Sequence, residues 1–198
     1  MTRQDTLVAL VGSRICHDLI SPLGAIGNGV ELMEMGGHAD SPEMELISES
    51  VDNANARVKF FRIAFGTASE EATVGRGEIT QLLAASARGG RLSYYWAVEG
   101  PQLRREVRAV FLTLMCFETA MPHGGDIHIR RHADSWELTS EGDRIRIDEA
   151  LWTSMTDRGA EVSVTPAQVQ FALLPQALDE IGRTLELRTG ADRLVVRF

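Results

Sequence analysis

The sequence predicts an α+β protein built from an N-terminal helical hairpin and a C-terminal α/β sandwich. In residues 4–35 and again in 40–67, apolar side chains recur every three or four positions, which is the period of an amphipathic helix. Gly36 and Gly37 lie between these two stretches, and paired glycines end a helix. From residue 77 onward helical and strand patterns alternate, as in a layered α/β domain.

The first predicted helix, 4–35, has two contrasting faces. At about 100° per residue, one face collects aliphatic side chains and should be buried: Val8, Val11, Ile15, Leu19, Leu23, Ile26, Val30 and Met33. His17 lies roughly 180° away, in a column of mostly small or polar residues: Ser13, His17, Ser21, Gly24, Asn28 and Glu31. We expect His17 to be exposed and within reach of a large partner, although an ordinary surface histidine is the alternative. Pro22 lacks an amide hydrogen and should bend the helix just after His17.

The second helix should begin at Asp40-Ser41-Pro42, where a polar cap precedes a proline suited to the first helical position. The short connection predicts an antiparallel hairpin. Its apolar residues form a heptad-like seam: Met44, Ile47, Val51, Ala54, Val58, Phe61 and Phe65. Further apolar residues of the first helix, including Leu7 and Ile20, exceed what one hairpin covers, so we expect two chains to pair in a dimeric four-helix bundle. A monomer whose hairpin packs on the rest of the chain is the alternative.

The pattern divides the chain into a hairpin (1–67), a linker without apolar periodicity (68–76) and an α/β domain (77–198). Within the last part we expect helices near 78–88, 102–121, 148–156 and 167–182. Strands are expected at 92–98, 126–131, 135–140, 143–147, 185–189 and 193–198.

Composition excludes several classes of function. The chain has 198 residues and a net charge of −8, which disfavours a nucleic-acid surface. No apolar run reaches the roughly 18–20 residues that span a bilayer, and the N-terminus lacks a signal-peptide pattern, so we expect a cytoplasmic protein without a membrane partner. Cys16 and Cys116 should be reduced, small apolar residues. His123, His128 and His132 lack the further ligands that a zinc site needs.

The run His17-Asp18-Leu19-Ile20-Ser21-Pro22-Leu23 resembles the H-box of the histidine kinase dimerisation helix. The longer stretch 14–33 is more similar still to the ChpT-type histidine phosphotransferases of alphaproteobacteria. That resemblance implies a phosphorelay in which His17 takes a phosphoryl group from a receiver domain of a hybrid kinase and passes it to response regulators. It also implies a C-terminal domain like the ATP-binding domain of histidine kinases.

The nucleotide-binding residues of that kinase domain are missing here. Residues 111–125 resemble the kinase helix that carries a metal-binding and ATP-binding asparagine, but Cys116 stands in its place, and a thiol is a poor ligand for Mg²⁺. Ser140 and Arg144 replace an aspartate and a glycine of the next motif, and 163–181 contains no glycine to form a phosphate-binding lid. We therefore expect no cofactor of its own and no autokinase activity. The domain should dock protein partners or support the bundle.

The resemblance assigns the nucleophile, and the faces of the two helices supply the other candidate site residues. His17 is the expected nucleophile, and Asp18 could orient its ring. Candidate partner-binding residues on the first helix are Ser13, Ser21, Gly24, Asn28 and Glu31, and the basic residues Arg57 and Arg62 are added from the second. The receiver domain would supply the Mg²⁺. Two alternatives remain open: a phosphatase of receiver domains, because Ser21 also fits the phosphatase pattern of kinase bundles, and a scaffold that docks regulators without transfer.

Overall fold

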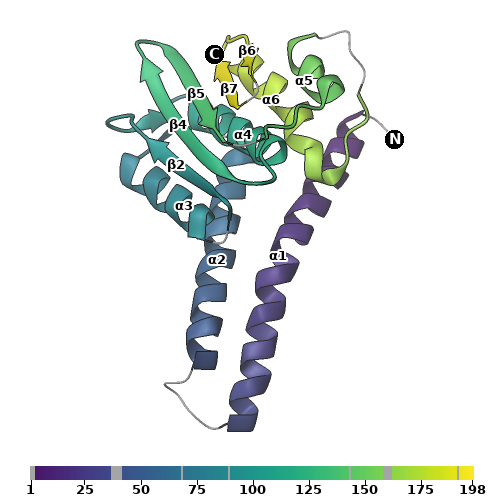
Figure 1. The fold of residues 1–198 in the computed structure, drawn as a ribbon, viewed down its shortest axis with the longest axis vertical. Coiled ribbons are helices and arrows are strands. Elements are labelled where there is room, and N and C mark those ends of the chain that lie inside the picture. Colours follow the sequence, from purple (N-terminus) through teal and green to yellow (C-terminus); the bar gives the residue numbers. More distant parts are fainter. Residues whose placement is uncertain are drawn as a thin grey trace.

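Two long antiparallel helices, α1 (Arg3–Gly36) and α2 (Pro42–Ala64), project from one end of a mixed α/β body (Figure 1). This computed structural model describes residues 3–36, 42–67, 69–88, 90–142, 144–157, 162–190 and 192–198. The helix α1 ends at Gly36, as the paired glycines predict. The predicted cap at Asp40 and Ser41 lies outside the described residues.

The body follows the predicted alternation of helices and strands. Its elements are β1 (Thr73–Val74), α3 (Arg76–Arg88), β2 (Leu92–Trp96), β3 (Gln102–Leu103), α4 (Arg104–Ala120), β4 (Gly125–His132), β5 (Ser135–Glu141), α5 (Glu149–Thr156), the short 3₁₀ helix η1 (Pro166–Gln168), α6 (Val169–Glu180), β6 (Glu186–Thr189) and β7 (Arg193–Arg197). The five-stranded sheet has the order β2-β4-β5-β7-β6, with β2 parallel to β4 and the other pairs antiparallel. Helices α3, α4 and α6 cover one face of this sheet (Figure 1).

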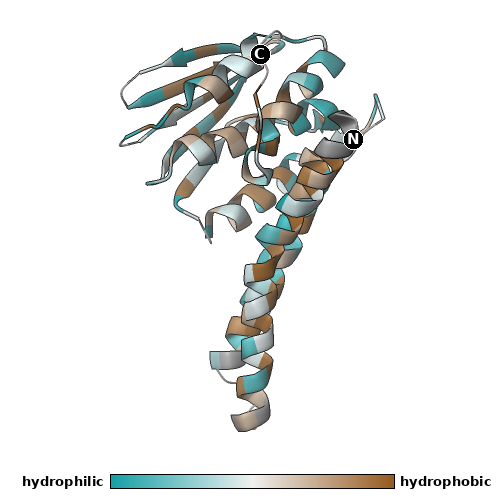
Figure 2. Ribbon diagram, turned by 90° about the vertical axis from the view of Figure 1, so that its right-hand side faces the viewer, coloured by the Kyte–Doolittle hydropathy of each residue, from teal (hydrophilic) through white to brown (hydrophobic). Residues whose placement is uncertain are grey.

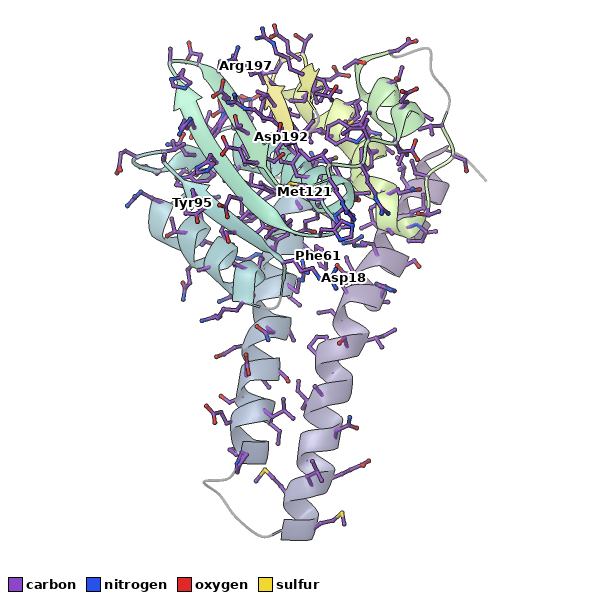
Figure 3. All side chains as sticks on the ribbon, in the orientation of Figure 1. Asp18, Phe61, Tyr95, Met121, Asp192 and Arg197 are labelled. Atoms are coloured by element: carbon purple, nitrogen blue, oxygen red, sulfur yellow. The ribbon has the colours of Figure 1, made fainter. Side chains whose placement is uncertain are left out.

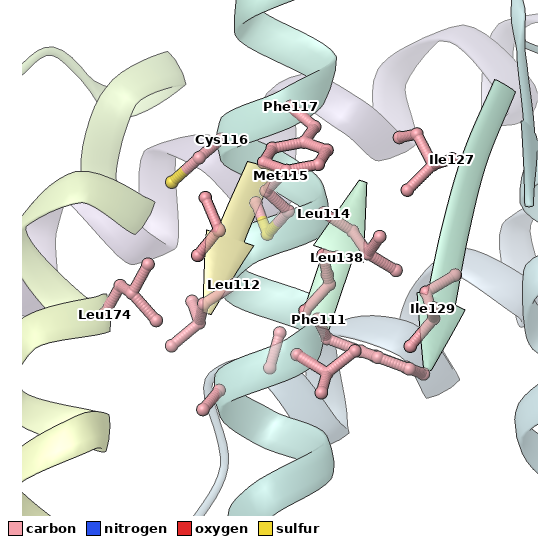
Figure 4. Close-up of a cluster of buried hydrophobic side chains, with 14 of the residues drawn as sticks. Phe111, Leu112, Leu114, Met115, Cys116, Phe117, Ile127, Ile129, Leu138 and Leu174 are labelled. Atoms are coloured by element: carbon pink, nitrogen blue, oxygen red, sulfur yellow. The ribbon is translucent and has the colours of Figure 1, made fainter. Parts of the chain in front are cut away.

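The core of the body forms around α4, because this helix lies between the sheet and the other helices. Phe111, Leu114 and Phe117 point toward Ile127, Ile129 and Leu138 of the sheet (Figure 4). Leu112 and Cys116 face the side of Leu174 in α6 (Figure 4). Twelve of the residues of α4 are buried, including Glu106 and Thr113, so this helix is covered on nearly every side.

The half of the hairpin that lies against the body is part of the same core. Phe60 of α2 stacks on Phe111 of α4 with ring centroids 4.4 Å apart. Phe61, Ile63 and Ala64 of α2 are buried beside it. From α1, four half-buried residues pack against this cluster: Leu7, Leu10, Val11 and Ile15.

The lower half of the hairpin leaves apolar side chains uncovered, so the expectation of a fully buried stripe on α1 is wrong for one chain. Val8, Leu23 and Val30 are exposed. We call one set of these side chains the exposed stripe: Ile20, Leu23 and Val30 on α1 and Met44, Val51 and Val58 on α2. Hydrophobic residues recur along this projecting part (Figure 2).

Three other expectations differ from the structure. Residues 144–147 pair with no strand, because Arg144 takes a left-handed conformation (φ 62°) and the Arg146 amide donates to the Ala120 carbonyl at the end of α4. The predicted linker contains β1, which pairs with β3. The Arg104 amide donates to the Ala72 carbonyl, so α4 starts at Arg104 rather than at 102.

By length and composition alone, Leu7–Met33 of α1 could cross a membrane, contrary to the sequence expectation. The stretch passes this test because α1 is apolar both where it faces α2 and along the exposed stripe. A helix that packs on a protein partner passes the same test, so the finding is weak evidence for a membrane segment.

Candidate functional site

His17 lies on α1 where the helix leaves the body, one residue before Asp18, which is labelled in Figure 3. Its side chain is 82% exposed, as the helical pattern predicts. The other members of its column are also exposed: Ser13, Ser21, Gly24, Asn28 and Glu31. A Cβ placed on Gly24 would have open space around it. The imidazole is therefore open to approach by another molecule.

The Asp18 carboxylate connects His17 to Arg14. Its Oδ1 atom lies 3.1 Å from Nδ1 of His17, and its Oδ2 atom accepts a hydrogen bond of 3.1 Å from Nε of Arg14. The Asp18 side chain is only 10% exposed, because adjacent positions differ by about 100° around a helix. Asp18 therefore turns inward while His17 points to solvent.

This contact sets the tautomer of the ring. A carboxylate accepts hydrogen bonds and cannot donate, so the hydrogen between His17 and Asp18 belongs to Nδ1. The neutral ring then has its lone pair on Nε2. An exposed Nε2 with a lone pair is a nucleophile, and the buried carboxylate can offset positive charge that forms on the ring during attack.

A cavity of about 330 Å³ opens beside Asp18 between α1, α2 and α3. Its lining is mostly small or polar and includes Asp18, Ser21, Asn53, Arg57 and Ser86. The guanidinium of Arg57 from α2 and the carboxylate of Asp18 from α1 therefore line the same cavity.

A second cavity, of about 250 Å³, shares Arg57 and Ser86 with the first and continues toward the body. There the Tyr94 hydroxyl donates a 2.9 Å hydrogen bond to Glu118. Burial, together with the Glu118 carboxylate, raises the pKa of Tyr94, while the nearby Arg57 lowers it. Tyr94 therefore stays a neutral donor.

The structure separates some of the predicted partner-binding residues from His17. At about 1.5 Å per residue, Asn28 and Glu31 lie roughly 16 and 21 Å farther along α1. Arg62 is exposed near the end of α2 and lies 4.0 Å from Glu78 of α3. Asn28 and Glu31 can therefore contact the same partner as His17 only if that partner is as large as a protein domain.

Sequence reasoning missed Arg14 and the residues that line the cavity. The spacing of Arg14 and Asp18, four positions apart, signals an ion pair on a helix and could have been recognised. The second partner of Arg14 could not: its NH1 atom donates a 3.1 Å hydrogen bond to the Ala167 carbonyl, 153 residues away. The contribution of Asn53 and Ser86 likewise depends on how α2 and α3 pack.

Two residues that stand in place of kinase nucleotide-binding residues, Cys116 and Ser140, are buried in the body. Cys116 is fully buried, its sulfur lies 4.0 Å from that of Met155 in α5, and burial raises its pKa. The ring of Trp152, also from α5, packs between Phe117 and Phe171, with centroids 6.2 and 5.6 Å away. Ser140 is buried, and its hydroxyl has no hydrogen-bond partner among the described residues. Apolar side chains thus occupy the space around Cys116.

Of the three histidines in or near β4, one stacks on an aromatic ring and two are exposed. His128 stacks on Tyr95 with ring centroids 4.7 Å apart, and His123 and His132 are exposed. Over the described ranges, no three His, Cys, Asp or Glu residues come together as a metal site.

Comparison with known proteins finds a matching family model, a similar sequence and a similar structure. A family model described as the histidine phosphotransferase C-terminal domain matches residues 76–193. The chain is 32% identical over 197 residues to the protein phosphotransferase ChpT of Brucella abortus (strain 2308), covering 96% of this chain and 93% of that protein. It also superposes on a solved bacterial phosphotransferase with a TM-score of 0.80 and 30% identity, covering 100% of this chain and 97% of the other.

Proposed function

Because this chain belongs to the histidine phosphotransferase family and acts in a phosphorelay, we propose that His17 is the residue that carries the phosphoryl group. The observation that supports this assignment is the geometry of the ring. His17 is 82% exposed, and the contact between Asp18 and Nδ1 leaves Nε2 as the ring nitrogen that carries the lone pair.

The transfer consists of two displacements at phosphorus. In the first, Nε2 of His17 attacks the aspartyl phosphate of a donor receiver domain. A nitrogen–phosphorus bond forms while the bond from phosphorus to the aspartate oxygen breaks, and the donor leaves as a free carboxylate. In the second, the aspartate of an acceptor receiver attacks the phosphohistidine, and His17 returns to its neutral form. Asp18 offsets the positive charge on the ring between the two steps.

The partners of this reaction are receiver domains of a hybrid kinase and of response regulators. The exposed column on α1, from Ser13 to Glu31, offers a surface without bulky side chains near His17. Arg57 and Arg62 add positive charge that suits an acidic receiver pocket. We propose that the receiver supplies the Mg²⁺ for the transfer, since phosphoryl transfer depends on positioning and on neutralising charge.

The active assembly in this proposal is a homodimer in the cytoplasm. The exposed stripe runs along the part of the hairpin that projects beyond the body, and a second hairpin would cover it in a four-helix bundle. The helix α1 also pairs Arg14 with Asp18 and packs on the body, which suits a dimerisation helix better than a membrane span.

The test is phosphotransfer from a ³²P-labelled receiver domain. We expect label on the wild-type protein and none on His17→Gln. The matched control is His132→Gln, another exposed histidine, which should accept label like the wild type. Label on His17→Gln would end the proposal for this residue.

The phosphotransfer experiment tests the phosphatase alternative, and a signalling assay in cells tests the scaffold alternative. Loss of label from the receiver as free phosphate, with no labelled intermediate on this chain, would indicate a phosphatase. Signalling that persists in His17→Ala would indicate a scaffold that only docks regulators.

A further inference from the structure

Arg14 connects the His17–Asp18 pair to the C-terminal body. Its Nε atom donates to Asp18 Oδ2 at 3.1 Å, and its NH1 atom donates to the Ala167 carbonyl at 3.1 Å. Asp18 in turn accepts from Nδ1 of His17 at 3.1 Å. A continuous chain of hydrogen bonds therefore runs from η1 of the body to the exposed ring.

The Ala167 carbonyl, where this series of hydrogen bonds ends, accepts a further hydrogen bond from within the body. Nε2 of Gln170 donates to the carbonyls of Ala167 and Met115 and to the Thr119 hydroxyl. Met115 and Thr119 belong to α4, the central helix of the core. Ala167 is thus connected through Gln170 to the buried central helix α4.

Arginine suits this position for a geometric reason. Its planar guanidinium presents several N–H donors in fixed directions, so one side chain can bond a carboxylate and a carbonyl at once. A lysine has a single ammonium on a flexible stem and cannot reproduce both directions. The Arg14 and Asp18 side chains are 15% and 10% exposed, so water screens their interaction little.

We propose that Arg14 is a positioning residue for phosphotransfer, which braces Asp18 against the C-terminal body and so fixes the orientation of the His17 ring. This inference rests on the proposed function, since it assumes that His17 carries the phosphoryl group. It gives the C-terminal body a role that does not involve a nucleotide: the body supplies the Ala167 carbonyl, which through Arg14 and Asp18 holds the His17 ring in place.

The first test compares Arg14→Gln and Arg14→Lys with the wild type in transfer from a phosphorylated receiver domain. We expect Arg14→Gln to lower kcat by about 10- to 100-fold, the usual cost of a misplaced reacting group or lost supporting contact. KM for the receiver should change less than about twofold, because the exposed docking column is untouched. Arg14→Lys should recover only part of the loss, and full activity in that variant would overturn the brace to Ala167.

The matched control is Arg108→Gln. Arg108 likewise joins two helices, α4 and α6, through a 2.6 Å ion pair with Glu180, and among the described residues it takes no part in the hydrogen bonds that link Ala167, Arg14, Asp18 and His17. We expect this variant to keep wild-type kcat. An equal loss of kcat in both variants would show a general effect on helix packing and overturn the proposal.

The second test measures the tautomer of His17 by ¹⁵N NMR of the imidazole. The wild-type protein at a pH where the ring is neutral should show hydrogen on Nδ1, and Arg14→Gln should shift the population toward hydrogen on Nε2. Hydrogen on Nε2 in the wild type itself would overturn the proposal without any variant, even if Arg14→Gln failed to fold.

A double-mutant cycle shows whether Arg14 acts through Asp18. In an Asp18→Ala background, Arg14→Gln should cause no further loss of kcat, whereas independent, additive losses would refute the mechanism. Failure of this inference is distinguishable from failure of the proposed function. Wild-type kinetics in Arg14→Gln, with His17→Gln still inactive, would remove only the role of Arg14, while label on His17→Gln would remove the function itself.

Discussion

At the scale of single residues, the site combines a ring in water with a carboxylate that is almost buried. His17 and Asp18 are adjacent in sequence, yet their side chains are 82% and 10% exposed. This difference allows the ring to meet a partner while its orientation is set from inside the protein. Asp18 is accompanied by Arg14, which supplies the opposite charge that a buried carboxylate requires.

Cys116 contrasts with His17, because it has no access to solvent. It is fully buried against Met155, and burial raises the pKa of its thiol, so the side chain stays neutral. An asparagine at this position would place an amide in an apolar environment.

We therefore expect Cys116→Asn to lower the free energy of unfolding by about 1–3 kcal/mol, the cost of burying unsatisfied polar groups. Cys16→Asn is the matched control, because Cys16 is exposed and its substitution should change stability by less than about 0.5 kcal/mol. Urea denaturation followed by circular dichroism measures both values. Equal stability of Cys116→Asn and the wild type would show that the amide finds partners there.

At the scale of elements, the helix α1 has three sides that differ in what they contact. One side packs on α2 and, near its start, on the body. A second side displays His17 and its column of exposed residues. The third carries Ile20, Leu23 and Val30 of the exposed stripe. The single chain explains the first side, and the proposed receiver and second copy explain the other two.

A charge on the exposed stripe tests the proposed dimer. We expect the wild type to have about twice the chain mass of 21.8 kDa in light scattering, and Leu23→Glu to shift to a single chain. The fold should survive, because Leu23 is 58% exposed in one chain. Leu32→Glu is the control: Leu32 is 49% exposed and lies about 180° away on the same helix, so the mass should stay doubled. A wild-type mass of one chain would contradict the bundle.

At the scale of the whole molecule, the hairpin and the body share one core. Phe60 stacks on Phe111, and Arg104 donates to the Arg62 carbonyl at 2.7 Å. The body therefore fixes the hairpin near the level of His17, and the exposed stripe is the surface left for the proposed second copy. We interpret the body as a support of the phosphotransfer site.

This interpretation has a consequence for nucleotides. We expect isothermal titration of the wild-type protein with MgATP to give no binding heat, and ³²P-ATP to leave His17 unlabelled, because Cys116 is fully buried against Met155. The positive control is the same preparation mixed with a labelled receiver domain, which should label it. Transfer of label from ATP to His17 would contradict the assignment.

The sequence by itself determined the features that depend on local periodicity. The bounds of α1, the exposure of His17 and most of the helices and strands from α3 to β7 follow from which residues recur every two or every three to four positions. The exceptions are the strand expected at 143–147 and the short strand β3. The resemblance of 14–33 to histidine phosphotransferases is confirmed by the family. The division into domains and the dimer stay predictions.

Only the tertiary structure decided what meets each helix face. The sequence places Asp18 next to His17 and Arg14 four positions before Asp18, but it does not say that the Ala167 carbonyl, 153 residues from Arg14, also binds Arg14. The same holds for the cavity lined by Arg57 and Ser86 and for the pairing of β1 with β3. The reason is physical: periodicity is a property of neighbouring residues, whereas contacts between distant segments depend on how whole elements pack.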